Sequence, residues 1–300
     1  MADTHRFGFA TLAGVPNVGK STLMNALVGE KISIVSRRPQ TTRHRIMGIC
    51  TASDYQIAFV DTPGLHKDQK KSLNRVINRT ALSSLGDVDV ILFMIDTSGW
   101  TPDLISLFRP VKESGRPVIL LINKIDKLKN KEQLLPLISE SMEVHSFASI
   151  VPLCSIRLDN RQELLDSIAQ VLPEGPPGFP ADQISDRSEK FLASELIREQ
   201  SYLLLGQELP YSIAVEVSNF EENDQGVLIV DATIFVEKPG QKSIVIGKGG
   251  QQLKKIGSAA RKQMEKSFGI KVFLNLWVKV RKNWSDGESH LHALGYGRDE

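Results

Sequence analysis

This chain has few cysteines, no apolar run long enough to span a membrane and no sequence typical of a secretory leader at its start. Its two cysteines, Cys50 and Cys154, are too few for a disulfide framework and are typical of a reducing compartment. No apolar run reaches the roughly 18 residues of a membrane-spanning helix. The first residues, MADTHRFGFATLAG, contain neither a basic leader nor a long apolar core. We therefore expect a soluble protein whose membrane contacts, if it makes any, are peripheral.

Acidic residues are nearly absent from one stretch of the chain. From Lys238 to Lys282 there are twelve Lys or Arg and one acid, Glu265, which leaves 25 basic against 34 acidic residues elsewhere. The net charge of +2 therefore conceals a local basic cluster. Such clustering favours a surface that binds a polyanion, although a solvated basic surface without a ligand is the alternative.

The first half of the chain alternates two kinds of pattern. Near-continuous aliphatic runs predict buried strands at residues 7–14, 55–61, 88–96, 116–123 and 149–154. Helical patterns lie around residues 20–29, 72–86, 102–114, 130–146 and 160–172. This alternation predicts an α/β domain with a doubly wound, mostly parallel sheet.

A second, smaller domain is expected after a linker. Four prolines and two glycines in PEGPPGFPADQISD, residues 173–186, interrupt both helix and strand. Beyond it we expect a helix at 188–205, strands at 211–218, 227–236, 243–246 and 271–280, and a basic helix ending near Phe268. The predicted boundaries are 1–172 for the first domain, 173–187 for the linker and 188–300 for an α+β domain.

A phosphate-binding loop follows the first predicted strand. GVPNVGKS, residues 14–21, matches G-x-x-x-x-G-K-[ST], in which glycines let backbone N–H groups surround phosphates at a helix N-terminus. Lys20 would reach the β- and γ-phosphates, and the Ser21 hydroxyl would bind magnesium. A chance glycine turn is the alternative, but a strand precedes the motif and a helix follows it. The expected contacts are Gly14, Asn17, Val18, Gly19, Lys20, Ser21 and Thr22.

Two further segments at predicted strand ends indicate which nucleotide binds. In DTPG, Asp61 is placed to hold magnesium through water, and the Gly64 amide to meet the γ-phosphate. In NKID, the Asp126 carboxylate can accept from two N–H groups on a guanine edge, which adenine does not present. Because strand ends of an α/β sheet face one crevice, the motifs together predict GTP or GDP with Mg²⁺. The residues concerned are Asp61, Thr62, Pro63, Gly64, Asn123, Lys124 and Asp126.

This order of motifs resembles the translation-factor-related GTPases. In that family a switch-loop threonine closes on magnesium when GTP is bound; RRPQTTRHR supplies Thr42, with Thr41 as the competitor. CSIR lies where the family has a guanine-binding triplet, so the resemblance implies contacts from Cys154, Ser155 and Ile156, with the Ser155 N–H donating to the guanine oxygen. The groups expected to act in hydrolysis are Lys20, Asn17, Thr42 and Gly64.

The residue after Gly64 departs from the Ras pattern. Ras-like enzymes have a water-orienting glutamine there, whereas this chain has Leu65. In related GTPases an asparagine at the position of Asn17 helps to hold a potassium ion against the phosphates. A potassium-assisted reaction is therefore one interpretation, and an asparagine that only satisfies a turn is the other.

VIGKGG, in the basic stretch, contains G-x-x-G at Gly247–Gly250. Its surroundings resemble a KH domain of type II, in which this loop clamps about four nucleotides of RNA by their backbone. The expected RNA-binding residues are Gly247, Lys248, Gly249, Gly250, Lys254, Lys255 and Arg261, with Lys262 extending the charge. The aliphatic residues expected to support bases are Ile244, Val245, Ile246 and Leu253.

A GTPase domain, a short linker and one KH domain resemble the Era family of bacterial GTPases, and the resemblance spans nearly the whole chain. It implies a GTP-hydrolysing switch that binds the 3′ end of 16S ribosomal RNA and assists maturation of the 30S subunit. We expect the protein to be a monomer. It also implies a cytoplasmic protein with peripheral association to the inner membrane. Two alternatives are a membrane-surface signalling GTPase and a constitutive RNA-binding protein whose nucleotide is structural.

Three other features receive structural interpretations. His290 and His292 lack a third ligand nearby in sequence, so we expect packing rather than zinc binding. Phe273 and Trp277 alternate on a predicted strand; stacking on bases is conceivable, but core packing is favoured. RRPQTTRHR is interpreted as a solvated switch loop rather than an RNA contact.

Overall fold

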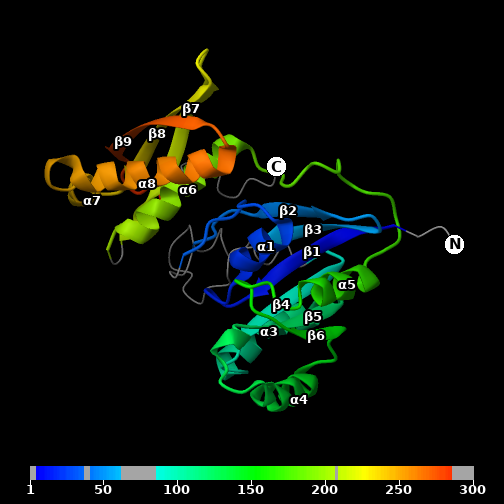
Figure 1. Cartoon of the computed structure of the whole chain (residues 1–300). Coiled ribbons are helices and arrows are strands. Elements are labelled where there is room, and N and C mark those ends of the chain that lie inside the picture. Colours follow the sequence, from blue (N-terminus) through cyan, green and yellow to red (C-terminus); the bar gives the residue numbers. More distant parts are fainter. Residues whose placement is uncertain (1–4, 37–40, 62–85, 207–208, 286–300) are drawn as a thin grey trace. The chain divides into compact units, whose positions relative to one another are not determined.

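The computed structural model describes residues 5–36, 41–61, 86–206 and 209–285, which divide into two compact units (Figure 1). The first unit contains residues 5–33, 42–61 and 86–186. The second contains residues 34–36, 41, 187–206 and 209–285. Each unit has its own sheet and core. Residues 34–36 and 41 are thus grouped with the C-terminal half of the chain.

A six-stranded sheet with the order β2-β3-β1-β4-β5-β6 forms the first unit. The strands are β1 (Arg6–Gly14), β2 (Ile46–Thr51), β3 (Tyr55–Asp61), β4 (Val90–Asp96), β5 (Val118–Asn123) and β6 (Ser149–Pro152). All neighbouring strands pair in parallel except β2, which is antiparallel to β3. The sheet therefore has the predicted doubly wound, mostly parallel architecture.

Helices on the sheet faces exclude water from its strands. The helices are α1 (Lys20–Val28), α3 (Pro102–Glu113), α4 (Leu134–Val144) and α5 (Arg161–Val171). Leu104, Phe108 and Leu137, from α3 and α4, share one core cluster with β4 and β5. All of β3 is buried. Burial on both faces of the sheet explains why its strands appear in the sequence as continuous apolar runs. The helix expected at 72–86 lies almost entirely outside the described residues.

Strand β2 was missed by the sequence reasoning. Its sequence, IMGICT, contains Gly48, where an added Cβ would lie 2.5 Å from the Ile32 side chain and 2.7 Å from Val28. The glycine is thus required because α1 and the residues after it pack closely against the strand. A glycine inside a short apolar run weakens a strand signal, although here it marks a close approach.

The proline-rich residues 174–186 pack against the sheet of the first unit. Gln56 on β3 is fully buried, and its side-chain oxygen accepts from the N–H groups of Gly178 and Phe179 at 2.8 and 2.9 Å. The Phe179 ring packs edge-on against Phe7 at 5.8 Å between centroids. Farther along, the Ile49 N–H donates to the carbonyl of residue 184 at 2.9 Å. This segment is therefore attached to the sheet by backbone and side-chain contacts.

The second unit contains a three-stranded sheet in the order β7-β8-β9. Its elements are α6 (Glu189–Leu204), β7 (Ala214–Glu222), β8 (Val227–Val236), α7 (Pro239–Ile246), α8 (Gln251–Phe268) and β9 (Lys271–Val280). Strands β7 and β8 are antiparallel, whereas β8 and β9 are parallel. Side chains from the three helices and one face of the sheet form a single apolar core, as expected for an α+β domain.

The strand predicted at 243–246 is wrong, because SIVI forms the last half of α7. Pro239 is the first residue of this helix, where its fixed φ and missing N–H are tolerated. The Gln241 side-chain oxygen accepts from the N–H groups of Glu237 and Lys238 at 2.8 and 2.9 Å. These N-terminal signals and the complete burial of Val245 outweigh the strand propensity of a β-branched run.

The prediction that Phe273 and Trp277 pack in the core is also wrong. The two side chains are 56% and 49% exposed, because odd-numbered positions of β9 lie on the face opposite the apolar core, which contains Val272 and Val278.

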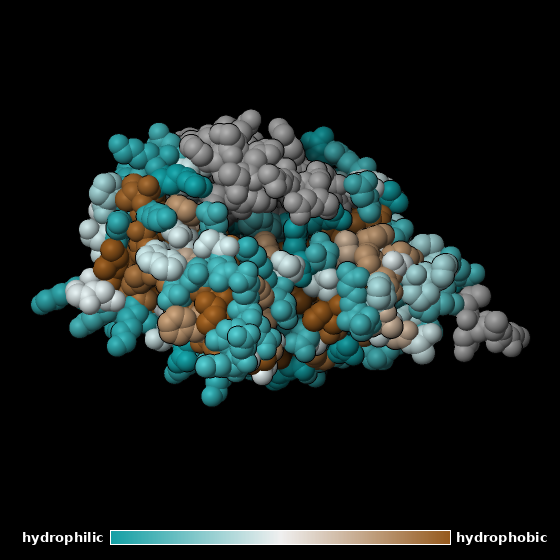
Figure 2. Space-filling view, turned by 90° about the horizontal axis from the view of Figure 1, so that it is seen from above, coloured by the Kyte–Doolittle hydropathy of each residue, from teal (hydrophilic) through white to brown (hydrophobic). Residues whose placement is uncertain are grey.

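No helix in the described ranges is long and apolar enough to cross a membrane. In the face drawn in Figure 2, hydrophilic residues separate the apolar ones, and no continuous apolar band crosses the part that is not grey.

Candidate functional site

The loop between β1 and α1 has a backbone that requires glycine at two positions. Gly14 has φ +140°, and a Cβ there would lie 2.4 Å from the Met94 carbonyl oxygen. Gly19 has φ +117°, and a Cβ there would lie 2.3 Å from the Asn123 side-chain nitrogen. The residue between them, Asn17, is exposed and also left-handed, with φ 62°. This chain path leads directly into the N-terminus of α1, where backbone N–H groups favour an anion.

Lys20, the first residue of α1, is buried in the same loop. Its ammonium donates to the carbonyl oxygens of Gly14 and Val15, each at 3.0 Å. Burial lowers the pKa of the Lys20 ammonium to about 8, and the Asp61 carboxylate partly opposes this change. A phosphate in the loop would add its negative charge to that of Asp61 and so stabilise the buried ammonium.

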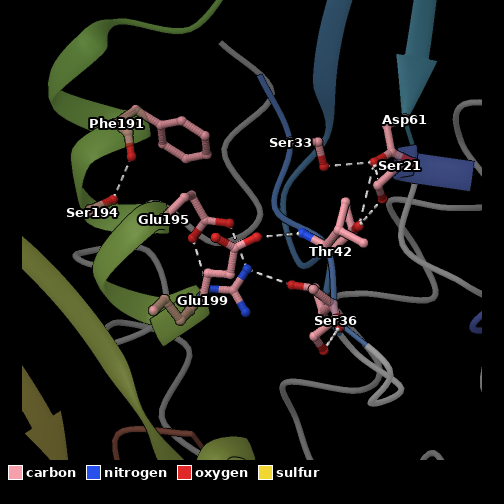
Figure 3. Close-up of polar contacts among 12 residues, drawn as sticks. Ser21, Ser33, Ser36, Thr42, Asp61, Phe191, Ser194, Glu195 and Glu199 are labelled. Carbon is pink, nitrogen blue, oxygen red and sulfur yellow. Dashed lines mark hydrogen bonds and ion pairs between the residues drawn. The ribbon is translucent and has the colours of Figure 1, made fainter. Parts of the chain in front are cut away.

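A cluster of hydroxyl groups surrounds the Asp61 carboxylate at the end of β3 (Figure 3). Asp61 Oδ2 accepts from the hydroxyls of Ser21 and Ser33 at 2.7 and 2.9 Å and from Thr42 at 3.4 Å. The Ser21 and Thr42 hydroxyls lie 2.9 Å apart. Burial raises the pKa of Asp61, while hydrogen bonds from the three hydroxyls and the charge of Lys20 act in the opposite direction.

The same cluster suits a magnesium ion. Asp61 Oδ1 is buried and has no hydrogen-bond partner among the described residues, which is costly unless another group satisfies it. The oxygens of Ser21, Thr42 and Asp61 are the hard donors that Mg²⁺ prefers. Among the residues that the structure describes, no group of three His, Cys, Asp or Glu side chains offers a metal site. The oxygen cluster and the unsatisfied Asp61 Oδ1 fit a Mg²⁺ ion.

Of the two candidate threonines, Thr42 is the one that lies in this cluster. The Thr41 hydroxyl instead lies 2.6 Å from the Ser36 hydroxyl. Ser33 is a member that the sequence reasoning missed. It is held by Asn25 on α1, whose side-chain oxygen accepts from the Ser33 N–H at 2.9 Å and whose amide donates to the Ser33 carbonyl at 2.6 Å. The interpretation of RRPQTTRHR as solvated is wrong for Thr42 and Arg43, which are 8% and 3% exposed.

The NKID residues join the phosphate loop to the CSIR segment. Asn123 is buried at the end of β5; its amide donates to the Val18 carbonyl at 2.7 Å and to the Ser155 hydroxyl at 3.0 Å. The Ser155 N–H, expected to meet a guanine oxygen, donates here to Asn123 Oδ1 at 3.0 Å. Lys124 has φ 64° and contacts Asp96, at the end of β4, at 3.2 Å. Asp96 was not singled out from the sequence, although its place at a strand end is a usable signal.

Asp126 is exposed and its carboxylate is ionised at neutral pH. A hydrogen bond from the Cys154 thiol lowers the pKa of Asp126, and Arg157 adds a smaller effect in the same direction. Cys154 itself is buried, while Ile156 is 81% exposed. An ionised, exposed carboxylate beside this edge of the sheet can accept two hydrogen bonds from a guanine. Thr62, Pro63, Gly64 and Leu65 lie outside the described residues.

The GKGG corner of the second unit combines positive φ angles with exposed charge. Gly247, Gly249 and Gly250 have φ of 72°, 57° and 77°. A Cβ at Gly247 would lie 2.6 Å from the Gln252 side chain, whereas Gly249 and Gly250 have open space around them. The corner leads into the N-terminus of α8, and Lys248 is exposed on it. Such a corner can approach a phosphate backbone closely.

Charge continues along α8 from this corner. Lys254, Lys255 and Lys262 are exposed. Arg261 is exposed as well, and it forms an ion pair with Glu265 at 3.1 Å. Of the aliphatic residues expected to support bases, Ile244 is 58% exposed, whereas Val245 is fully buried and unsuited to that role.

Comparison with known proteins agrees with both halves of this description. A family model described as "50S ribosome-binding GTPase" matches residues 9–124, and one described as "KH domain" matches residues 208–285. The chain is 51% identical to GTPase Era of Xylella fastidiosa strain M12 over 292 residues, covering 97% of this chain and 98% of that protein. It is 48% identical to GTPase Era of Haemophilus influenzae strain PittGG over 289 residues, covering 96% of each.

Two solved structures match with a TM-score of 0.94 and 40% identity, each covering 98% of this chain and 100% of the other. One is an Aquifex aeolicus Era variant bound to GDP and AlF4⁻. The other is Era in complex with MgGDPNP and nucleotides 1506–1542 of 16S ribosomal RNA. With this identity over almost the full length, and with both the phosphate loop and the glycine corner in place, the chain belongs to the Era family of GTPases.

Proposed function

We propose that this protein is a GTP-hydrolysing switch that binds the 3′ end of 16S ribosomal RNA and assists maturation of the 30S ribosomal subunit. The observation that carries the proposal is the full-length similarity to an Era structure that holds both MgGDPNP and RNA from that end of 16S rRNA. The basic GKGG corner of this chain supplies a suitable contact for an RNA backbone. The protein would act in the cytoplasm, as a monomer, with any membrane association peripheral.

On the nucleotide side, the phosphates would lie over the loop from Gly14 to Thr22. Lys20 would exchange its contacts with two loop carbonyls for contacts with the β- and γ-phosphates, and thereby stabilise the charge that develops during hydrolysis. Asp126 would accept from the guanine edge while Lys124 lies along the base. Asn123 would act indirectly, because its side chain joins the phosphate loop to Ser155.

Mg²⁺, when bound, neutralises charge on the β- and γ-phosphates. Ser21 and Thr42 would hold it through their hydroxyls, and Asp61 through water. The geometry supports Thr42 over Thr41, because the Thr42 hydroxyl is the one beside Ser21. Closing of Thr42 on the ion would depend on the γ-phosphate, which gives the protein two states to switch between.

The direct test is binding to an RNA that carries the 3′-terminal sequence of 16S rRNA, with an internal 16S fragment of equal length as competitor. We expect preference for the 3′-terminal RNA and single-turnover hydrolysis of GTP. Crosslinking in cells, followed by sequencing of the bound RNA, should recover the same end. Equal affinity for both RNAs would contradict the ribosomal assignment. Binding to anionic vesicles without RNA preference would favour the membrane-surface alternative, and absence of hydrolysis would favour the structural nucleotide.

Potassium should accelerate the reaction if Asn17 holds a monovalent cation. Asn17 is exposed in the phosphate loop, and a cation beside the phosphates would do what an arginine finger does. We expect wild-type hydrolysis to be at least about tenfold faster in potassium than in sodium, because an arginine finger is worth far more than this. Asn17→Ala should remove the difference while GTP still binds.

The matched control is Asn160→Ala, which removes another left-handed asparagine, with φ 61°, at the start of α5. It should keep the potassium preference. Equal wild-type hydrolysis rates in potassium and sodium would contradict the role of a potassium ion. The group that replaces the water-orienting glutamine would then come from a protein or RNA partner.

A further inference from the structure

Helix α6 buries charged residues that its apolar core does not explain. Glu195, Arg198 and Glu199 are 3%, 1% and 4% exposed. The residues that α6 contributes to the apolar core of the second unit are different ones: Leu192, Ala193, Leu196 and Ile197. Taking charged groups out of water is costly unless partners compensate each of them. The burial of these charged side chains therefore requires compensating contacts, which the structure contains.

Two of these three residues, Arg198 and Glu199, contact backbone atoms of Thr41 and Val35, which belong to the same compact unit as α6. Both Glu195 carboxylate oxygens accept from Arg198, at 2.7 and 2.5 Å, so the guanidinium is fixed. Its Nη2 also donates to the Thr41 carbonyl at 2.5 Å. Glu199 Oε1 accepts from the Val35 N–H at 2.9 Å.

These contacts lie next to the oxygen cluster along the chain. Thr41 is bonded directly to Thr42, whose hydroxyl is 2.9 Å from that of Ser21. Val35 is two residues after Ser33, whose hydroxyl is 2.9 Å from Asp61 Oδ2. The α6 side chains thus fix one backbone group just after Ser33 and another just before Thr42. Both contacts are to main-chain atoms, so they set where the segment lies and do not read its side chains.

We propose that Arg198 and Glu199 are positioning residues for GTP hydrolysis: by holding the Thr41 carbonyl and the Val35 N–H, they present Thr42 to the magnesium ion. This inference rests on the proposed function, in which Thr42 binds Mg²⁺. It adds that two α6 side chains would act through backbone contacts made within their own unit, one of them to the residue bonded to Thr42. Misplacing a catalytic group by about 1 Å can cost a hundredfold in rate, so a loose segment should slow hydrolysis without preventing nucleotide binding.

Glu199→Ala is the principal test, because it removes one acceptor and leaves the Glu195–Arg198 pair intact. We expect single-turnover hydrolysis to slow by about 10- to 100-fold, and the Mg²⁺ concentration for half-maximal rate to rise. GDP affinity and RNA affinity should stay within about twofold of wild type. Glu199→Gln keeps an acceptor oxygen for the Val35 N–H, so it should restore most of the rate. Glu189→Ala, at an exposed position of the same helix, is the control and should leave the rate unchanged.

Arg198→Lys tests the other contact. A lysine keeps the positive charge beside Glu195 but lacks the planar fork that reaches two partners together, so the same raised Mg²⁺ requirement is expected. Unchanged rate and Mg²⁺ dependence in both variants would overturn the inference while wild-type hydrolysis still supports the proposed function. If the wild-type protein does not hydrolyse GTP, the proposed function itself is contradicted. If Glu199→Ala loses GDP and RNA binding together with hydrolysis, the Arg198→Lys result decides between positioning and general destabilisation.

Discussion

Asp126→Asn is expected to change the preferred base from guanine to xanthine. The ionised Asp126 carboxylate offers two acceptors, which match the two neighbouring N–H groups of guanine. An amide offers one acceptor and one donor, so its NH₂ would oppose a guanine donor but match the carbonyl of xanthine. GTP affinity should fall by at least about a hundredfold, because a site built for hydrogen bonds rejects a mismatched partner strongly. The XTP affinity of the variant should exceed its GTP affinity.

Competition between fluorescent GTP and XTP analogues measures this exchange. Asp166→Asn, on the exposed surface of α5, makes the same change in charge and should keep the preference for GTP. If the Asp126 variant still binds GTP better than XTP, Asp126 lies outside the base pocket. The remaining NKID residues would then have to be reassigned, since Lys124 and Asn123 neighbour it in the same turn.

Replacing Lys248 and Gly249 by aspartate should abolish RNA binding and leave GTP binding intact. Each carboxylate would repel the phosphates that the corner must approach. The fold should tolerate the change, because Lys248 is exposed and a Cβ at Gly249 meets nothing within 4 Å. The φ of 57° at Gly249 is one that aspartate adopts more readily than most residues. We expect RNA affinity to fall by at least about a hundredfold, given the strong dependence of such binding on phosphate contacts.

The other end of α8 provides a matched control. Lys266 is exposed, and Gly269 has φ 71° with open space around it, so replacing both by aspartate repeats the change in charge and backbone. A helix rises about 1.5 Å per residue, which puts the two sites roughly 25 Å apart and beyond the screening length of about 8 Å at physiological salt. RNA affinity should therefore change little in the control.

Filter binding or fluorescence anisotropy over a range of salt concentrations separates the two surfaces. The GKGG variant should also show a smaller decrease of affinity with salt, because fewer counterions are released. Equal losses in both variants would mean that general basic charge, and not the glycine corner, binds the RNA. Unchanged affinity in the GKGG variant would place the RNA elsewhere on the protein.

The sequence by itself determined the α/β architecture, most strands of the first unit and the order of the nucleotide motifs. These features are encoded locally. A strand buried on both faces must be apolar throughout, as β3 is, and a turn with positive φ beside a carbonyl must contain glycine, as at Gly14. Because parallel strands end at one edge of a sheet, the spacing of the motifs also predicted that Asp61 and Asn123 lie at the same edge.

Only the tertiary structure decided features that depend on distant partners. SIVI has the composition of a strand but forms a helix because Val245 enters the core beside residues far away in the chain. Trp277 is apolar but exposed because it lies on the face of its sheet opposite the apolar core that the described helices cover. The charges of α6 look like a solvated helix surface in sequence, yet they are buried against Val35 and Thr41, more than 150 residues earlier. Composition cannot show which surface a side chain meets, because burial is a property of the pair in contact and not of either residue alone.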